Sequence, residues 1–99
     1  MSKRKIVWDK QALHYFRESI RYIRKDSPQN ADKVKNEVLE KINELLKRPE
    51  IHHPDQYKIK NKGNYRAFEL HRLRVGYLVK EDEIIITRVR NTNQEPLDY

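Results

Sequence analysis

The segment from residue 65 to residue 90 constrains the fold more than any other part of the chain. Along it, apolar residues alternate with polar or cationic ones at a period of two, the pattern of strands with one buried face. The alternation breaks at His71 and Arg72 and again between Lys80 and Glu83, which predicts three consecutive antiparallel strands. Each strand carries at least one arginine, and a small sheet cannot bury so many guanidinium groups. We therefore expect one face in the core and a basic working surface on the other.

Two amphipathic helices are predicted before this segment. A β-branched run over residues 3–8 predicts a first strand, and Asp9 can cap the helix that follows it. Ser27 and Pro28 then end that helix and begin a second one, which stops before Pro49. Apolar residues recur at helical spacing in both: Ala12, Leu13, Phe16, Ile20 and Ile23 in the first, and Ala31, Val34, Val38, Ile42, Leu45 and Leu46 in the second. We predict a single α+β domain over residues 1–99, β-α-α-β-β-β, with a helical hairpin packed on a small twisted antiparallel sheet.

Charge and cysteine content narrow the possible partners and compartments. The chain has 22 Lys and Arg against 15 Asp and Glu, a net charge of +7, which favours an anionic partner such as nucleic acid or an acidic protein. A basic surface kept for solubility alone is the simpler alternative. The absence of cysteine excludes disulfides and thiolate metal sites and fits a reducing compartment. No apolar run is long enough for a signal peptide or a membrane span, so we expect a cytoplasmic protein without membrane contact.

Neither a metal nor a cofactor is expected. His52 and His53 are neighbours in a proline-rich loop, and adjacent histidines rarely face one ion. The other two histidines, His14 and His71, stand at no metal-binding spacing. Only two glycines occur, which leaves no phosphate-cradling glycine loop for a nucleotide.

Basic residues gather between residues 57 and 79, and one more arginine follows in the last strand. The loop lysines could hold phosphates, although lysines at alternate loop positions are often merely exposed. The predicted nucleic-acid contacts are Lys58, Lys60, Lys62, Arg66, Arg72 and Arg88.

Several motifs follow one another in an order that is typical of one family. They are Trp8 before a helix with Ala12 and a Tyr22-Ile23 pair, the close of the second helix at Ile42, Leu45, Leu46 and Pro49, the strands YRAFEL and RVGYLV, and the ending IIITRVRNTNQEPLDY. That ending is similar to the tail pattern RVRHT(x)xEPLxY. Nearly end to end, the chain resembles the RelE/ParE superfamily of bacterial toxins from type II toxin–antitoxin pairs.

The resemblance implies growth arrest and a cognate antitoxin, whose acidic or amphipathic segment would lie across the sheet and helices. Some members resemble RelE and cut mRNA on the ribosome, whereas others resemble ParE and inhibit DNA gyrase. Fold alone does not decide between these activities. We expect ribosome-dependent mRNA cleavage first, because it explains the positive field and the arginines. Gyrase inhibition is the alternative, and a non-catalytic nucleic-acid-binding module is a further one.

The register of the resemblance determines the candidate catalytic residues. When RVGYLV is aligned with the strand that carries the nuclease arginine, Arg74 matches that arginine and Tyr99 matches the terminal tyrosine of the family. In that register Ala67 and Glu69 occupy the positions of the nuclease lysine pair. Asn93 replaces the C-terminal arginine, and a further departure is Asn91, where the tail pattern often has histidine. These departures favour the gyrase alternative.

Metal-independent RNA cleavage by a 2′-hydroxyl needs a base, a group that stabilises the phosphorane charge and an acid. The candidates are Glu69 or His71 as the base. Arg74, with Arg88 or Arg90, would stabilise the charge, and Tyr99 would stack or act as the acid.

Strand geometry tests this assignment. A two-residue turn at His71 and Arg72 would place Glu69 opposite Arg74, either as a site or as a cross-strand ion pair of under about 1 kcal/mol. The same register pairs Arg66 with Tyr77, Phe68 with Val75 and Leu70 with Leu73. A four-residue connection over residues 80–83 would turn Arg88 and Arg90 into the core. We therefore predict an odd-length connection or a β-bulge that moves them to the side of Arg74.

Overall fold

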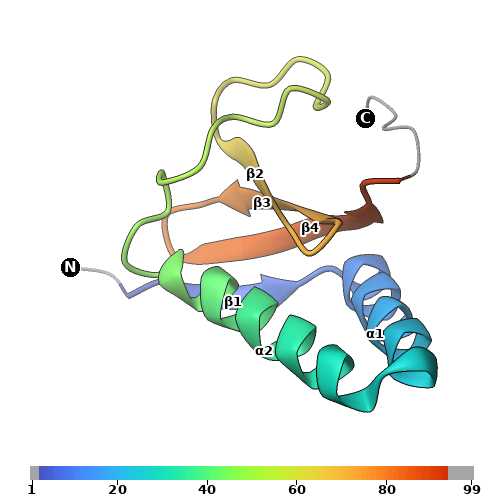
Figure 1. Ribbon diagram of the computed structural model, residues 1–99. Coiled ribbons are helices and arrows are strands. Elements are labelled where there is room, and N and C mark those ends of the chain that lie inside the picture. The colour runs from blue at the N-terminus through green and yellow to red at the C-terminus, as the bar shows by residue number, and fades with distance from the viewer. Residues whose placement is uncertain (1–2, 94–99) are drawn as a thin grey trace.

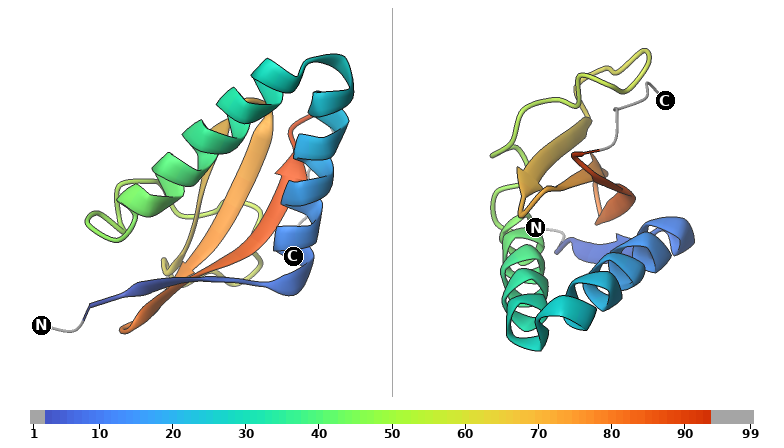
Figure 2. Two further views of the ribbon diagram at one scale, coloured as in Figure 1. Left: turned by 90° about the horizontal axis from the view of Figure 1, so that it is seen from below. Right: turned by 45° about the vertical axis from the view of Figure 1, so that its right-hand side comes forward.

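The computed structural model describes residues 3–93 and contains the predicted sequence of elements (Figure 1). Two helices pack on one face of a four-stranded sheet, and a long loop stands on the other side (Figures 1 and 2). The elements are β1 (Lys5–Trp8), α1 (Lys10–Asp26), α2 (Pro28–Glu44), β2 (Tyr65–Leu70), β3 (Leu73–Val79) and β4 (Glu83–Asn91). The α+β fold with a helical hairpin is therefore confirmed.

The strand order across the sheet is β1-β4-β3-β2. β2, β3 and β4 form the predicted antiparallel meander, whereas β1 pairs in parallel with β4, from Lys5 opposite Glu83 to Trp8 opposite Ile86. The expectation of a wholly antiparallel sheet was wrong for this one strand, and the sheet is mixed. The helical hairpin that follows β1 is the long crossover that a parallel pair requires.

Both helices begin where the sequence places their caps. The Asp9 carboxylate accepts hydrogen bonds from the backbone N–H groups of Gln11 and Ala12, at 2.9 and 3.3 Å. The Ser27 hydroxyl accepts one from Asn30 N–H at 3.1 Å, and Pro28 occupies the first helical turn. These bonds satisfy backbone donors that no helical carbonyl can reach. Neither helix of the described chain combines the length and apolar character that crossing a membrane would need.

The core lies between the helical hairpin and the inner face of the sheet. Among the described residues, fifteen hydrophobic ones are buried there: Ala12, Phe16, Ile20, Ala31, Val34, Val38, Ile42, Leu45, Phe68, Leu73, Val75, Tyr77, Ile84, Ile86 and Val89. Trp8 packs against Phe16 with ring centroids 5.4 Å apart. Burial raises the pKa of Tyr77 to about 12, so its hydroxyl stays protonated and donates to the Pro49 carbonyl at 2.9 Å. Both predicted helical stripes contribute to this core.

The β2–β3 hairpin has the predicted register. His71 and Arg72 adopt φ values of +53° and +64°, the left-handed pair of a type I′ turn. Their turn sets Glu69 opposite Arg74, with Phe68 opposite Val75, Leu70 opposite Leu73 and Arg66 opposite Tyr77. The two faces of this hairpin therefore follow from its turn length.

A β-bulge in β4 separates its apolar residues from its arginines. Val79 lies opposite Ile84 and Tyr77 opposite Ile86, but Gly76 lies opposite Arg88, so Thr87 is an extra residue without a partner on β3. Beyond the bulge, Val89 pairs with buried Val75. The predicted bulge is thus confirmed: Arg88 and Arg90 stand on the side of the sheet away from the helices.

Adjacent isoleucines on β4 test the assignment of the two faces. Ile84 is buried in the core, whereas Ile85 is only partly buried on the other face. We expect Ile84→Ala to lower the free energy of unfolding by about 2–5 kcal/mol. Ile85→Ala removes the same atoms from a half-covered position and should cost about half of that or less. Urea unfolding of the two variants measures the difference, and equal losses would contradict the assignment.

Candidate functional site

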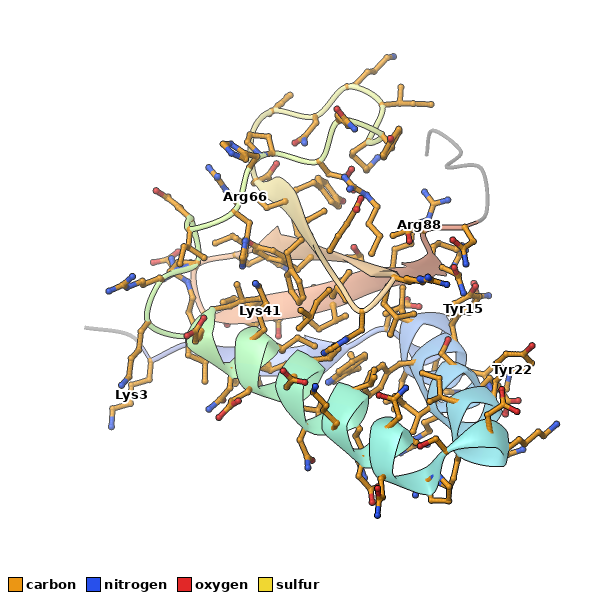
Figure 3. The ribbon with its side chains drawn as sticks, viewed as in Figure 1. Lys3, Tyr15, Tyr22, Lys41, Arg66 and Arg88 are labelled. Carbon is orange, nitrogen blue, oxygen red and sulfur yellow. The ribbon has the colours of Figure 1, made fainter. Side chains whose placement is uncertain are left out.

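The outer face of the sheet, defined as the face away from the helices, brings four of the predicted site residues together: Glu69, Arg74, Arg88 and Arg90. One row across the strands contains Glu69, Arg74 and Arg90, and the next contains Ala67, Gly76 and Arg88. In Figure 3, Arg88 rises from this side of the sheet. The sequence therefore located a basic face and the Glu69–Arg74 pair correctly, but not the contacts of Arg74 with Asp55 or of Arg90 with Tyr15.

Arg74 is held by two carboxylates. Its guanidinium donates to Asp55 Oδ1 at 2.8 Å and to Glu69 Oε2 at 2.7 Å, and it lies 4.7 Å from the ring centroid of Tyr57. The Arg74 side chain is only 19% exposed. Burial alone would lower the pKa of Arg74, but hydrogen bonds and charge attraction from Asp55 and Glu69 outweigh it and raise the pKa. The guanidinium is thus permanently charged and already paired.

Asp55 is the residue that sequence reasoning missed. It is 3% exposed, and no other charged residue among residues 3–93 is buried. Besides Arg74, its carboxylate accepts a hydrogen bond from Tyr57 N–H at 3.0 Å. That local bond is an Asx turn, for which an aspartate after Pro54 is the only sequence signal. Its ion-pair partner Arg74 lies 19 positions further along the chain, and no sequence pattern links the two residues.

The candidate base His71 has a partner on α2. Its Nε2 atom lies 2.9 Å from Glu37 Oε2, which ties the hairpin turn to the helix. Tyr99, the candidate acid, lies outside the described residues. Of the two candidate bases, Glu69 therefore lies against the candidate stabiliser Arg74, whereas His71 is paired with α2.

The predicted nucleic-acid contacts divide into separate places. Lys58, Lys60 and Lys62 belong to the loop before β2, and Arg72 is exposed in the hairpin turn. Arg66 instead projects toward the helix side and donates to the His52 carbonyl at 2.6 Å. The alternation of β2 turns Arg66 away from Arg74, as its predicted pairing with Tyr77 requires, so these cations do not form one surface.

Arg90 shares a row with Arg74 but reaches another partner. Its guanidinium carbon lies 5.3 Å from the ring centroid of Tyr15 on α1, and its Nη1 atom donates to the Val89 carbonyl at 2.8 Å. A cation over an aromatic face is stabilised by the ring quadrupole. Arg90 is therefore drawn toward α1 and not toward the carboxylates at Arg74.

The two adjacent histidines have different environments. His52 packs between the rings of Phe68 and Tyr77, at centroid distances of 4.9 and 6.2 Å. Burial, followed by the charge of Lys41, lowers the pKa of His52 from 6.5. His53 is exposed. Among residues 3–93, no group of three or more His, Cys, Asp or Glu side chains is placed to hold a metal ion.

A groove of about 590 Å³ opens where α1 and α2 meet the β2–β3 turn. Its wall includes Tyr15 and Tyr22 of α1, both labelled in Figure 3, and Tyr22 is 73% exposed. The remaining lining residues are Glu18, Ser19, Ile23, Asn30, Val34, His71, Arg72, Leu73, Asn91 and Asn93. An exposed aromatic beside an apolar floor is a feature of protein-binding surfaces.

The two partners of Arg74 allow a test of its structural role. Arg74→Ala removes the guanidinium that neutralises the buried Asp55 carboxylate, and we expect it to lower the free energy of unfolding by about 3–5 kcal/mol. Glu69→Gln removes the charge of a 53% exposed side chain and should cost under about 1 kcal/mol. Denaturant unfolding at one pH compares the two variants. A loss of under about 1 kcal/mol in both would contradict the structural role of Arg74.

His52 makes stability depend on pH. Its folded-state pKa lies below 6.5, so the unfolded chain binds the proton more tightly. The stability due to neutral His52 is therefore complete above pH 6.5 and is lost as pH falls toward the lowered folded-state pKa. We expect His52→Gln to flatten the curve of unfolding free energy against pH below 6.5, whereas His53→Gln keeps the His52 imidazole in place and should retain most of the slope. Identical curves for the two variants would rule out His52 as the cause.

Comparisons with known proteins agree with the geometry. The family model described as "ParE toxin of type II toxin-antitoxin system, parDE" matches residues 6–96, which is most of the chain. The solved structure of the "Chromosomal ParDE TA system from P. aeruginosa" contains a similar chain, with a TM-score of 0.70 at 17% identity, covering 90% of this chain and 96% of that one. At this identity the structure supports the fold, and the family match carries the assignment. No curated protein matches the sequence. The chain belongs to the ParE toxin family of type II toxin–antitoxin systems.

Proposed function

We propose that this ParE-family toxin arrests growth by inhibiting DNA gyrase and that a cognate antitoxin neutralises it. Membership of the family implies the antitoxin, and the resemblance to ParE implies gyrase as the target. This preference replaces ribosome-dependent mRNA cleavage, which the sequence alone favoured slightly. The reason is the state of the residues that cleavage would use.

The observation that carries the proposal is the double ion pair of Arg74. A cation that stabilises a phosphorane must approach the phosphate directly, and its positive potential must be available there. The Arg74 guanidinium already faces Asp55 and Glu69 at 2.8 and 2.7 Å. Two carboxylates beside the same group would repel a phosphate. The residue best matched to the nuclease arginine is thus occupied by structural contacts.

The remaining nuclease positions also lack suitable groups. Ala67 and Glu69 stand where the nucleases carry a lysine pair, and Asn91 stands where the tail pattern often has histidine. An amide such as Asn91 does not transfer a proton at neutral pH. A toxin that acts by binding a protein target does not require these groups, which is why gyrase inhibition fits the chain better.

The groove at the helix ends supports the antitoxin part of the proposal. It offers exposed Tyr22 and apolar Ile23, Val34 and Leu73 on a chain with a net charge of +7. An acidic amphipathic segment complements both features, because its apolar side can enter the groove while its carboxylates meet the positive field.

Purified toxin separates the two activities directly. With gyrase, ATP and relaxed plasmid, we expect loss of supercoiling and accumulation of broken DNA after denaturation, and neither effect when gyrase is omitted. In a translating extract, mapped mRNA ends should match those of an extract without toxin. New mRNA ends together with unimpaired supercoiling would reject gyrase inhibition in favour of cleavage.

The variant Glu69→Gln sharpens this comparison inside cells. If Glu69 were the base of a nuclease, its loss should slow RNA cleavage by a factor of about 10²–10⁴ and relieve the growth arrest. We expect growth arrest to persist, because Glu69 makes an exposed ion pair and the proposed mechanism needs no base. Equal amounts of soluble wild-type and variant protein, checked by immunoblot, are the required control.

A further inference from the structure

The loop before β2, which we define as the lysine loop over residues 55–64, is fixed by hydrogen bonds despite its lack of regular structure. The Asn61 side chain donates to the carbonyls of Asp55 and Tyr65, at 3.2 and 2.8 Å. The same side chain accepts from Gly63 N–H at 2.9 Å and from Tyr65 N–H at 3.3 Å. Asn61 therefore closes the loop from within.

A second set of contacts attaches the lysine loop to the sheet. Asp55 N–H donates to the Tyr65 carbonyl at 2.8 Å, and the Asp55 carboxylate binds Arg74 on β3. Figures 1 and 2 show the loop projecting from the sheet on the opposite side from the helices. Because these contacts already fix its shape, a partner would spend little free energy on ordering it.

The tip of the lysine loop presents cations around one exposed apolar side chain. Ile59 is 55% exposed and stands between Lys58 and Lys60, with Lys62 two positions further on. Residues 56–64 contain no acidic residue. Lys60 has a φ of +56°, so the chain turns sharply directly after Ile59. A single exposed isoleucine is ordinary on a surface, but here it projects from a fixed loop whose charged residues beyond Asp55 are all lysines.

These features fit duplex nucleic acid better than a single strand. Proteins that hold single strands stack the bases on free aromatic faces. The two rings of the loop region are already covered by cations: Tyr57 by Arg74 at 4.7 Å and Tyr65 by Lys58 at 4.9 Å. By contrast, lysines on phosphates with an isoleucine between them match the mode in which proteins enter the minor groove and wedge an apolar side chain against a base step.

We propose that the lysine loop binds duplex DNA, with Lys60 and Lys62 on phosphates and Ile59 wedged into the minor groove. The inference deepens the proposed function, since a toxin that acts on gyrase meets DNA at its target. It is tested without gyrase, so the two proposals can fail separately.

Binding is measured by fluorescence anisotropy of a labelled 20-base-pair duplex across a series of salt concentrations. We expect the duplex to bind more tightly than a single strand of the same length. The double variant Lys60→Gln with Lys62→Gln removes two phosphate contacts. The slope of the logarithm of the binding constant against the logarithm of salt concentration, here called the salt slope, should fall in magnitude by about 1.8. Binding at 0.1 M salt should weaken by roughly tenfold or more. Tighter binding of the single strand, or an undiminished slope, would overturn the proposal.

A matched control removes two lysine charges from another part of the surface. Lys33 and Lys35 are exposed on α2 with the same spacing as the loop pair. Lys33→Gln with Lys35→Gln should bind DNA at least fivefold more tightly than the loop variant. Equal weakening by the two double variants would show that net charge alone attracts the DNA, and the assignment to the loop would be wrong.

The wedge is tested by base unstacking. A duplex that carries 2-aminopurine at an A·T-rich step should brighten on binding of the wild-type toxin, because unstacking relieves quenching of that base. Ile59→Ala should lose most of this increase while its salt slope stays unchanged, since both lysines remain. An equal increase with Ile59→Ala would remove the isoleucine from the proposal. Gyrase inhibition by a toxin that binds no DNA would overturn the DNA-binding inference alone.

Discussion

The arrangement of β4 depends on one constraint: its apolar side chains must enter the core while its arginines must not. β4 is a central strand, parallel to β1 on one side and antiparallel to β3 on the other. Ile86 and Val89 are both buried, although they are three residues apart, and a regular strand would point them to opposite faces. The extra residue Thr87 restores the match. Without it, Val89 would leave the core and Arg88 and Arg90 would enter it, at a cost of several kcal/mol for each unpaired guanidinium.

The bulge in turn decides what lies beside Arg74. Once β4 is shifted, Arg90 stands opposite Arg74, and two cations share one row of the outer face. Such a row needs nearby negative charge, and Asp55 and Glu69 supply it at Arg74. Because Asp55 belongs to the loop before β2, the ion pair that balances the charge of Arg74 also attaches that loop to the sheet. Packing, charge balance and loop shape are thus connected through a single guanidinium. The same contacts remove Arg74 from chemistry on a phosphate.

Features specified by nearby residues were predictable from the sequence. The caps at Asp9 and Ser27 depend on donors within three positions, and the hairpin register depends on the two-residue turn at His71 and Arg72. The bulge was also predictable, because the cost of burying arginines leaves few other solutions. Each of these inferences needed only periodicity and the chemistry of adjacent side chains.

Features set by distant contacts were not. The parallel pairing of β1 depends on how the helical hairpin returns the chain, and no residue of β1 records that direction. The Asp55–Arg74 pair and the reach of Arg90 to Tyr15 join segments 19 and 75 positions apart, and loop residues carry no periodicity to reveal such partners. The candidate site was therefore predicted as a set of residue types on a face. Which cations were engaged and which remained available could come only from the fold.

The positions of the two proposed surfaces have a consequence for neutralisation. The groove is lined by α1, α2, the hairpin turn and the end of β4, and none of its lining residues belongs to the lysine loop. An antitoxin segment that filled only the groove would leave Ile59, Lys60 and Lys62 uncovered. Such a complex would keep its affinity for DNA while losing its effect on gyrase. Neutralisation that also abolished DNA binding would instead require the antitoxin to extend around the sheet to the loop, or to repel DNA through its own negative charge.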